Sequence, residues 1–384
     1  MKIGIEAQRL FRKRKHGIEL VAVELIKNLQ VLDKVNEYFI FIKPDEDSSC
    51  IRETENFNII QIKTHIYPLW EQVVLPQTAK KLGCDILHCT SNTAPIFTNI
   101  PVIVTLHDII YLEKSYLQII NSNGTSYQKY GNIYRRFVVP RIVVKAKKII
   151  TVSHSEKSRI LEYFSYGVND SRMAVVYNGV GKEFTHVVDL ELLNHVKELY
   201  RLPDSFILFL GNTDEKKNTN GVLKAYSEFL KQSPQKLPLV IPDFKSKDVV
   251  RSLASIGNPE IEPYIHLIGY VPNHYMPGFY NLCTMFLYPS LRESFGIPIL
   301  EAMKSGKPVI TSNTSSMPEV SGGNAILVDP YKPEEITNGM LQLINDKELY
   351  QNLVKKGCEQ AEKFTWEKMA EDVLFIYNQI ATKL

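Results

Sequence analysis

The stretch Tyr288-Pro-Ser-Leu-Arg-Glu-Ser-Phe-Gly-Ile-Pro-Ile-Leu-Glu301 decides the fold of this chain. The apolar run that ends at Tyr288 predicts a buried strand. Pro298 suits the first turn of a helix, where its missing N–H costs nothing. Gly306 is a favourable left-handed end for that helix, and a new apolar run, 308–311, predicts the next strand. Strand, loop, helix and strand in this order predict an open parallel sheet, whose ligands bind beyond the carboxyl ends of the strands.

Two carboxylates lie at this predicted ligand-binding edge. Glu293 shares a short polar loop with Ser294 and Gly296, and Glu301 lies in the helix that follows. A helix N-terminus favours a phosphate, and carboxylates accept hydrogen bonds from the vicinal hydroxyls of a sugar or ribose. The combination indicates a sugar nucleotide. The alternative is a helix with a solvated glutamate at each end.

The segment from Glu293 to Glu301 resembles the Glu-x7-Glu signature of the family 4 retaining glycosyltransferases (glycosyl transferases group 1), because the loop, the glycine, the proline and the helix all accompany the glutamates. The resemblance implies an α/β protein of GT-B fold, with two Rossmann-like domains that face across a cleft. It implies transfer of a hexosyl unit from a nucleotide diphosphate sugar, with retention of configuration and no required metal. Glu293 and the backbone of Ser294, Phe295 and Gly296 would hold the sugar, Ile297 would begin the phosphate-binding helix, and Glu301 would hold the ribose.

Length and composition agree with a two-domain globular protein. The 384 residues are 44% hydrophobic and 23% charged, and the net charge of +3 is too small to imply binding to nucleic acid. No apolar run approaches the length of a membrane span, and the chain opens on an expected strand, Met1 to Ala7, rather than a signal peptide. The five cysteines form no Cys-x2-Cys pair, which favours reduced thiols in a cytoplasm.

Short apolar runs alternate with amphipathic segments along the whole chain, which predicts parallel sheets. The expected strands are 2–7, 38–42, 57–61, 86–88, 102–106, 149–152, 174–176, 206–210, 239–241, 265–267, 285–288, 309–311 and 326–327. The expected helices are 17–29, 69–82, 127–146, 219–231, 247–256, 297–304, 334–345, 347–363 and 366–382. A break between Asn178 and Pro203 suggests an acceptor-side domain, 1–185, and a donor-side domain, 200–365. The last segment, 366–384, is expected to return to the first domain.

Further candidates in the second half follow the expected strand 206–210. Gly211 and the adjacent Lys216 and Lys217 suit an anion at a strand-to-helix turn, and the alternative is a solvated loop. In the family, a basic pair at this place holds the donor diphosphate, and some relatives have an arginine where this chain has Asn212. Val271 and Tyr280 resemble the family's base-binding region, and the alternative for Tyr280 is a tyrosine of the core. Glu319 lies in the loop after the expected strand 309–311 and is expected to cap a helix.

Three candidates in the first half carry a weaker resemblance. His107 and Asp108 end the strand 102–106. The family has a similar pair that faces the donor sugar. His107 is therefore expected to contact that sugar, and Asp108 is expected to orient His107 or to contact the acceptor. A structural histidine is the alternative. Gly17 matches a family glycine at a helix start near the reacting groups. The basic run Arg12–Lys15 suits anionic lipid or a phosphate-bearing acceptor, or is a solvated loop.

The expected function is therefore hexosyl transfer from a UDP- or GDP-linked donor to a glycan, lipid-linked or other hydroxyl acceptor, in polysaccharide or glycan assembly. Glu293, Lys217 and His107 are the expected catalytic residues. The location is expected to be cytoplasmic, with possible peripheral contact at the inner face of the membrane. Two alternatives stay open: a sugar-nucleotide epimerase of the same architecture, and a non-catalytic subunit that binds nucleotide sugars. A nicotinamide oxidoreductase is disfavoured because no Gly-x-Gly-x-x-Gly follows the first strand.

Overall fold

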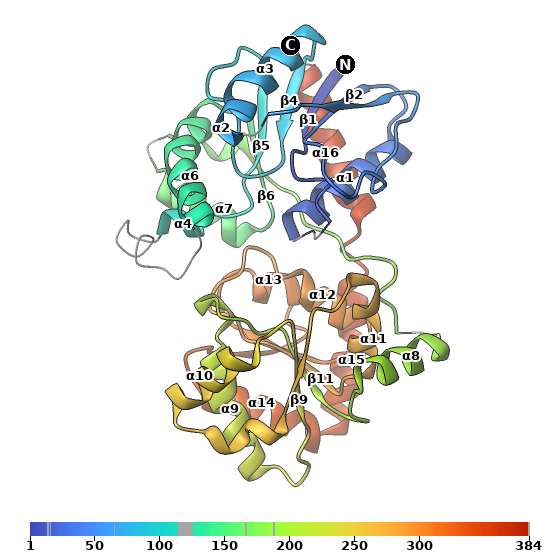
Figure 1. The fold of residues 1–384 in the computed structure, drawn as a ribbon, viewed down its shortest axis with the longest axis vertical. Helices are drawn as coiled ribbons and strands as arrows, with labels where there is room; N and C mark the ends of the chain where they lie inside the picture. The colour runs from blue at the N-terminus through green and yellow to red at the C-terminus, as the bar shows by residue number, and fades with distance from the viewer. Residues whose placement is uncertain are drawn as a thin grey trace. The chain divides into compact units, whose positions relative to one another are not determined.

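A computed structural model describes residues 1–13, 15, 17–64, 66–113, 126–165, 167–186 and 189–382, and the side chains of 126–128 are not described. The contacts between residues divide the chain into two compact units (Figure 1). Unit 1 is Met1–Asn178 with Trp366–Leu384, and unit 2 is Gly179–Thr365. In the described part of the chain, no helix is both long enough and apolar enough to cross a membrane.

Unit 1 contains a seven-stranded parallel sheet in the order β3-β2-β1-β4-β5-β6-β7. Its strands are rich in Ile, Val and Phe and are mostly buried, as expected where helices cover both faces of a parallel sheet. Their bounds are β1 Lys2–Glu6, β2 Glu37–Ile42, β3 Phe57–Gln61, β4 Ile86–Cys89, β5 Val102–Thr105, β6 Lys148–Thr151 and β7 Met173–Val175.

The helices of unit 1 connect these strands, with one exception at the end of the chain. They are α1 Gly17–Leu32, α2 Tyr67–Leu69, the π-helical turn η1 Trp70–Val74, α3 Leu75–Lys81, α4 Ile110–Glu113, α6 Ser126–Lys145, α7 His154–Tyr163 and η2 Asp170–Arg172. The exception, α16 Trp366–Ala381, lies beside α1 (Figure 1). The hydroxyl of Tyr377 in α16 lies 2.6 Å from Nδ1 of the buried His88 in β4. The expected return of the last helix to the first domain is confirmed.

Unit 2 contains a six-stranded parallel sheet in the order β10-β9-β8-β11-β12-β13. Its strands are β8 Ile207–Phe209, β9 Leu239–Pro242, β10 Ile265–Ile268, β11 Met285–Tyr288, β12 Val309–Ser312 and β13 Ile326–Val328. Its longer helices are α8 Leu190–Tyr200, α9 Thr219–Gln232, α10 Ser246–Ile256, α12 Ile297–Lys304, α14 Pro333–Asn345 and α15 Lys347–Ala361. Its short helices are η3 Glu215–Lys217, η4 Pro259–Tyr264, η5 Asn273–Tyr275, α11 Met276–Leu282 and α13 Met317–Ser321.

The fold class is confirmed, and each expected strand is present within one residue at either end. The helices differ from the expectation in several places. The segment expected as one helix over 69–82 contains the π-helical turn η1. Helix α8 lies inside the expected break before Pro203. It was not predicted, because Val196 is its one buried residue. Helices α11 and α13 are too short to show a helical period, with seven and five residues.

Candidate active site

The candidate site of unit 2 lies where the strand order reverses. Strands β8 and β11 are neighbours in the sheet, and the chain leaves them on crossovers to opposite sides. In open parallel sheets, ligands bind at such a switch point, beyond the carboxyl ends of the strands. The loop after β8 carries Lys216 and Lys217, and the loop after β11 carries Glu293. The fold therefore brings together two loops that are 76 residues apart in sequence.

The lysine loop is shaped by short polar side chains that accept hydrogen bonds from nearby backbone N–H groups. Oδ1 of Asn212 accepts from Asp214 N at 2.8 Å, and Oδ1 of Asp214 accepts from Lys216 N at 3.2 Å. The loop begins at Gly211, where a larger residue would not fit, because a Cβ there would lie 2.3 Å from the Phe209 ring. Asn218 ends it in the left-handed region with φ of 56°. Its amide donates to the carbonyls of Pro289 at 3.0 Å and Pro330 at 2.7 Å, which ties the loop to those after β11 and β13.

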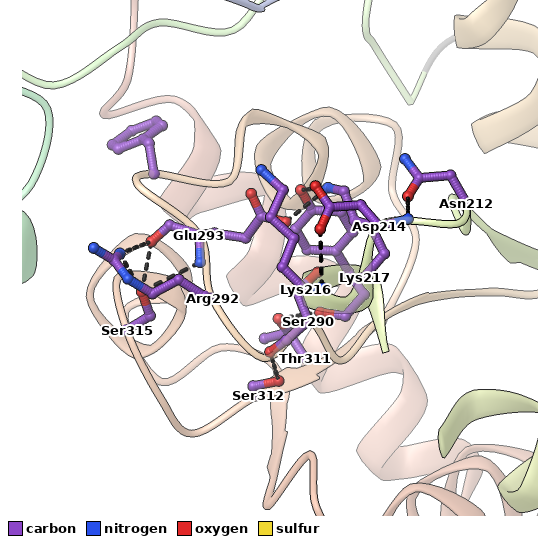
Figure 2. Close-up of polar contacts among 12 residues, drawn as sticks. Asn212, Asp214, Lys216, Lys217, Ser290, Arg292, Glu293, Thr311, Ser312 and Ser315 are labelled. Atoms are coloured by element: carbon purple, nitrogen blue, oxygen red, sulfur yellow. Dashed lines mark hydrogen bonds and ion pairs between the residues drawn. The ribbon is translucent and has the colours of Figure 1, made fainter. Parts of the chain in front are cut away.

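Lys217 and Glu293 form the centre of the site (Figure 2). Nζ of Lys217 donates to Oε1 of Glu293 at 2.7 Å and to the hydroxyl of Tyr288 at 2.8 Å. Burial favours the protonated carboxyl, but the ammonium groups of Lys217 and Lys216 outweigh it and hold the pKa of Glu293 below its usual range. An ammonium has three N–H donors. Among the described residues, Nζ donates hydrogen bonds to these two groups, so a third N–H is available to a ligand such as a phosphate oxygen.

The backbone of Glu293 is held by the loop after β12 (Figure 2). The Ser315 hydroxyl donates to the Glu293 carbonyl at 2.5 Å, and the Ser316 hydroxyl donates to the same oxygen at 3.0 Å. Arg292 donates to that carbonyl at 3.0 Å and to the Ser315 hydroxyl at 3.1 Å. Glu293 is thus held by groups beyond the ends of three neighbouring strands, β8, β11 and β12, which is the rigidity that a binding site requires. Sequence reasoning missed Tyr288, Asn218 and Ser315, because no motif marks them.

Helix α12 begins beside Glu293. Gly296 precedes the helix with φ of 105°, a backbone conformation that side chains rarely adopt, and the proline occupies the first turn as expected. Ile297 starts the helix, and Gly306 has the expected positive φ, 69°, after its end. Phe295 is buried and its ring lies 5.8 Å from that of Phe364, while the side chain of Ser294 is half-buried. The helix start, with its partial positive charge, therefore adjoins the Lys217–Glu293 pair.

Glu301 differs from Glu293 in its hydrogen-bond partner and in the direction of its pKa shift. Its Oε2 accepts from the hydroxyl of Tyr280 at 2.8 Å, and burial raises its pKa to about 7. Tyr280 is fully buried and its ring contacts those of Phe184 and Phe286, which agrees with the core-tyrosine alternative. Val271, in the loop after β10, is also buried. Glu319 lies in the first turn of α13, where a carboxylate interacts favourably with the helix dipole.

The candidates in unit 1 lie beyond the strand ends of its own sheet. His107 follows β5 and is buried; its Nε2 is 2.9 Å from the Thr90 carbonyl and its backbone N–H donates to Asn92 Oδ1 at 2.6 Å. Because a carbonyl only accepts, Nε2 carries the proton, and burial lowers the pKa of His107 and keeps the ring neutral. Asp108 accepts from Ile110 N at 3.1 Å at the start of α4. Gly17 begins α1, and a Cβ there would meet nothing within 4 Å.

Two of the buried carboxyl groups of unit 1 lie near its switch point and were not singled out from the sequence. Glu6 ends β1, and its Oε2 is a buried oxygen without a hydrogen-bond partner in the described part of the chain. Glu71, in η1, accepts hydrogen bonds from Tyr67 at 2.7 Å, Gln72 at 2.8 Å, Thr93 and Tyr134. Burial raises the pKa of Glu6 to about 7 and raises that of Glu71. Both lie at or near the switch point between β1 and β4.

Two family models match the chain. Glycosyltransferase Family 4 matches residues 16–184, and Glycosyl transferases group 1 matches residues 193–360. The chain is 30% identical over 235 residues to O-antigen chain mannosyltransferase B of Escherichia coli, a match that covers 61% of each protein. It is also 30% identical over 246 residues to the serotype-specific mannosyltransferase WbdA of Escherichia coli, covering 62% of this chain and 29% of that protein. The matches thus span less than two thirds of the length of these relatives.

Solved structures agree with the fold. A glycosyltransferase from Rickettsia africae has a TM-score of 0.73 at 19% identity, over 99% of this chain and 98% of that one. HepE from Anabaena, in complex with UDP, has a TM-score of 0.72 at 16% identity, over 99% of this chain and 100% of that one. The two family models together account for both units and confirm the resemblance carried by Glu293 and Glu301. The chain therefore belongs to the group 1 glycosyltransferases, with a family 4 amino-terminal half.

Proposed function

We propose that this protein transfers a hexosyl unit from a nucleotide diphosphate sugar to an acceptor hydroxyl, with retention of configuration. The observation that carries the proposal is the ion pair between the half-buried Lys217 and the buried Glu293 at the switch point of unit 2. It provides a cation for a phosphate and an ionised carboxylate for sugar hydroxyls within one site. Glycosyl transfer needs both groups, because charge develops on the leaving diphosphate while the sugar has to be held in place.

In this proposal, each part of the unit 2 site binds one part of the donor. Lys217, Lys216 and the start of α12 at Ile297 hold the diphosphate, and Gly211 keeps the adjoining loop close to it. Glu293 and the backbone of 294–296 hold the hexose, Glu301 holds the ribose hydroxyls, and Val271 lies beside the base. Unit 2 is then the donor side, and unit 1, with His107, Asp108 and Gly17, is the acceptor side. His107 contacts the transferred sugar as a neutral hydrogen-bonding group.

The proposed step is a front-face exchange at the anomeric carbon. The bond between that carbon and the diphosphate oxygen breaks, and the electron pair leaves with the diphosphate. The acceptor oxygen bonds to the same face of the carbon, and its proton passes to the departing phosphate oxygen. Lys217 stabilises the charge that develops on the diphosphate, and the route requires no side-chain nucleophile. No metal is assigned a part in this step.

We propose the sugar, the base, the acceptor and the location in less detail than the reaction. The relatives named as mannosyltransferases favour a mannosyl donor, so a GDP- or UDP-linked hexose is expected, and GDP-mannose is the first to test. The O-antigen names favour a glycan or lipid-linked glycan acceptor in polysaccharide assembly. The five free cysteines agree with a cytoplasmic location, where the inner face of the membrane is accessible.

A donor screen with and without acceptor tests this function. Each sugar nucleotide is incubated with the protein alone and then with glycan acceptors, and the products are identified by mass spectrometry and proton NMR. The proposal predicts slow donor hydrolysis without acceptor and a glycosidic product of unchanged anomeric configuration with one. Conversion of the donor into an epimer would support the epimerase alternative. Tight donor binding with neither hydrolysis nor transfer would support a non-catalytic subunit.

A further inference from the structure

The outer face of α6 exposes an unusual row of large apolar side chains. Tyr130, Ile133, Phe137 and Val144 are 56%, 50%, 55% and 57% exposed. Together with the exposed Arg141 they recur every three or four residues, so they form one stripe along the helix. The opposite face is already used, because Val138, Val139, Ile142 and Val143 are buried in the core of unit 1. The exposed stripe is therefore a second apolar face.

The segment that forms and directly follows α6 is strongly basic. Residues 126–148 contain seven basic residues and no acidic residue: Lys129, Arg135, Arg136, Arg141, Lys145, Lys147 and Lys148. Several of these charges are held by neutral oxygens. Arg141 donates to the Phe137 carbonyl at 2.6 Å and lies 3.8 Å above the Phe137 ring, and Arg135 donates to Asn132 Oδ1 at 3.2 Å. In these contacts, the partner of each guanidinium is a neutral oxygen or an aromatic ring.

The apolar and basic surface continues beyond α6. Phe97 is 82% exposed, and the ammonium of Lys145 donates to the carbonyl of the preceding residue, Ile96. Phe97 and Lys145 line a surface hollow together with Val73 of η1 and Lys80 of α3. Figure 1 shows α6 along an outer edge of unit 1, near α2. Three segments of the chain therefore contribute to one surface of mixed aromatic and basic character.

The basic run Arg12–Lys15 does not share this character. Arg12 lies 3.6 Å from Glu19, Lys13 lies 3.1 Å from Glu46, and Lys15 forms an ion pair with Asp47. Arg14 lies outside the described residues. The charge of this run is thus largely compensated, which weakens the expectation that it contacts anionic lipid.

We propose that the outer face of α6 docks this protein on a bilayer that contains anionic phospholipid. Aromatic and aliphatic side chains insert at the headgroup boundary, and the surrounding Lys and Arg interact with lipid phosphates. The stem of each basic side chain covers apolar surface while its charge stays with the headgroups. The absence of carboxylates from the segment favours a continuous negative surface as the partner.

Vesicle flotation with the full chain tests the proposal. The protein should float with vesicles of equal parts phosphatidylcholine and phosphatidylglycerol, remain below vesicles of phosphatidylcholine alone, and be released by high salt. The variant Arg141→Gln/Lys147→Gln should bind the anionic vesicles about 30-fold more weakly. The variant Ile133→Ser/Phe137→Ser should bind at least about tenfold more weakly. All four positions are exposed, so circular dichroism should match the wild-type spectrum.

Matched controls separate this face from general charge and hydrophobicity. The variant Lys355→Gln/Lys356→Gln removes two exposed charges from α15, and Phe375→Ser removes an aromatic ring that is 63% exposed on α16. Both should float like wild type. Equal loss in these controls, or unchanged flotation of both α6 variants, would overturn the proposal. Self-association through α6 without vesicle binding, measured by analytical ultracentrifugation, would replace the bilayer with a second copy of the chain.

Discussion

The two switch points of this molecule have the same topology and opposite electrostatics. In unit 2, the buried Glu293 meets the ammonium of Lys217 at 2.7 Å, and its pKa is lowered. In unit 1, Glu71 is surrounded by hydroxyl and amide donors, and burial raises its pKa and that of Glu6. The Lys217–Glu293 pair keeps a carboxylate charged with a cation beside it, whereas Glu71 in unit 1 is held by neutral hydrogen-bond donors.

This difference shows that the fold supplies only the position of a site. A charged pair with a free ammonium N–H is suited to a phosphate, whereas buried neutral carboxyls would repel one if they ionised. The contrast supports the assignment of the donor to unit 2. The contrast also indicates that Glu71 stabilises unit 1, because its carboxyl joins η1, α6 and the loop after β4 through Tyr134 and Thr93.

The largest effect is expected for Lys217→Met. Loss of the ammonium removes the stabilisation of the leaving diphosphate, and kcat/KM should fall by about 10²–10³. Because Glu293 is then a buried charge without its partner, the free energy of unfolding should also fall by about 3 kcal/mol. Steady-state kinetics and urea denaturation measure the two effects, and Lys216→Met is the matched control with a smaller loss. Full activity in Lys217→Met would remove it from the site.

Glu71→Ala should affect stability rather than donor binding. The substitution removes the acceptor that the hydroxyls of Tyr67, Thr93 and Tyr134 share, and unit 1 should lose about 3 kcal/mol of stability. Glu71→Gln keeps one carbonyl oxygen and should lose less. Urea denaturation and calorimetry with donor measure the two properties. A large loss of donor affinity with unchanged stability would contradict the contrast between the switch points.

Donor affinity should rise with pH through Glu301. Its pKa is raised to about 7, so about a tenth of it is ionised at pH 6 and about nine tenths at pH 8. The ionised carboxylate accepts from both ribose hydroxyls, whereas the protonated form has to donate one bond. Affinity for an intact sugar nucleotide should therefore increase by up to about ninefold over this range. Glu301→Gln should show a flat profile, and a wild-type profile that falls with pH would contradict ribose binding.

The smallest structural effect is expected for Gly17→Ala. A Cβ at this helix start meets no atom within 4 Å, so the free energy of unfolding should change by less than about 0.5 kcal/mol. If donor or acceptor approaches this backbone, the methyl group should lower kcat/KM measurably. Unchanged kinetics at unchanged stability would leave Gly17 without a part in the site. Gly257→Ala is unsuitable as a control, because Gly257 has a positive φ of 74°.

The sequence predicted local features well and long-range contacts poorly. The apolar run before Tyr288, Pro298 and Gly306 each impose a local backbone preference, and β11 and α12 have the predicted bounds. The hydrogen bond between Lys217 and Tyr288 joins residues 71 positions apart, and it depends on the order of strands in the sheet. Glu71 gave no signal because one carboxylate between Trp70 and Gln72 is typical of an exposed helix face. Glu71 is buried within the π-helical turn, which no sequence pattern indicated.

A calorimetric titration with intact GDP- and UDP-linked hexoses tests the central claim, that unit 2 holds the donor through Lys217. Wild type and Glu71→Gln should bind the same sugar nucleotide with similar affinity. Lys217→Met should bind it at least about tenfold more weakly, because one charge-assisted hydrogen bond to phosphate is lost. Equal affinity of Lys217→Met and wild type, or a loss in Glu71→Gln alone, would contradict the claim.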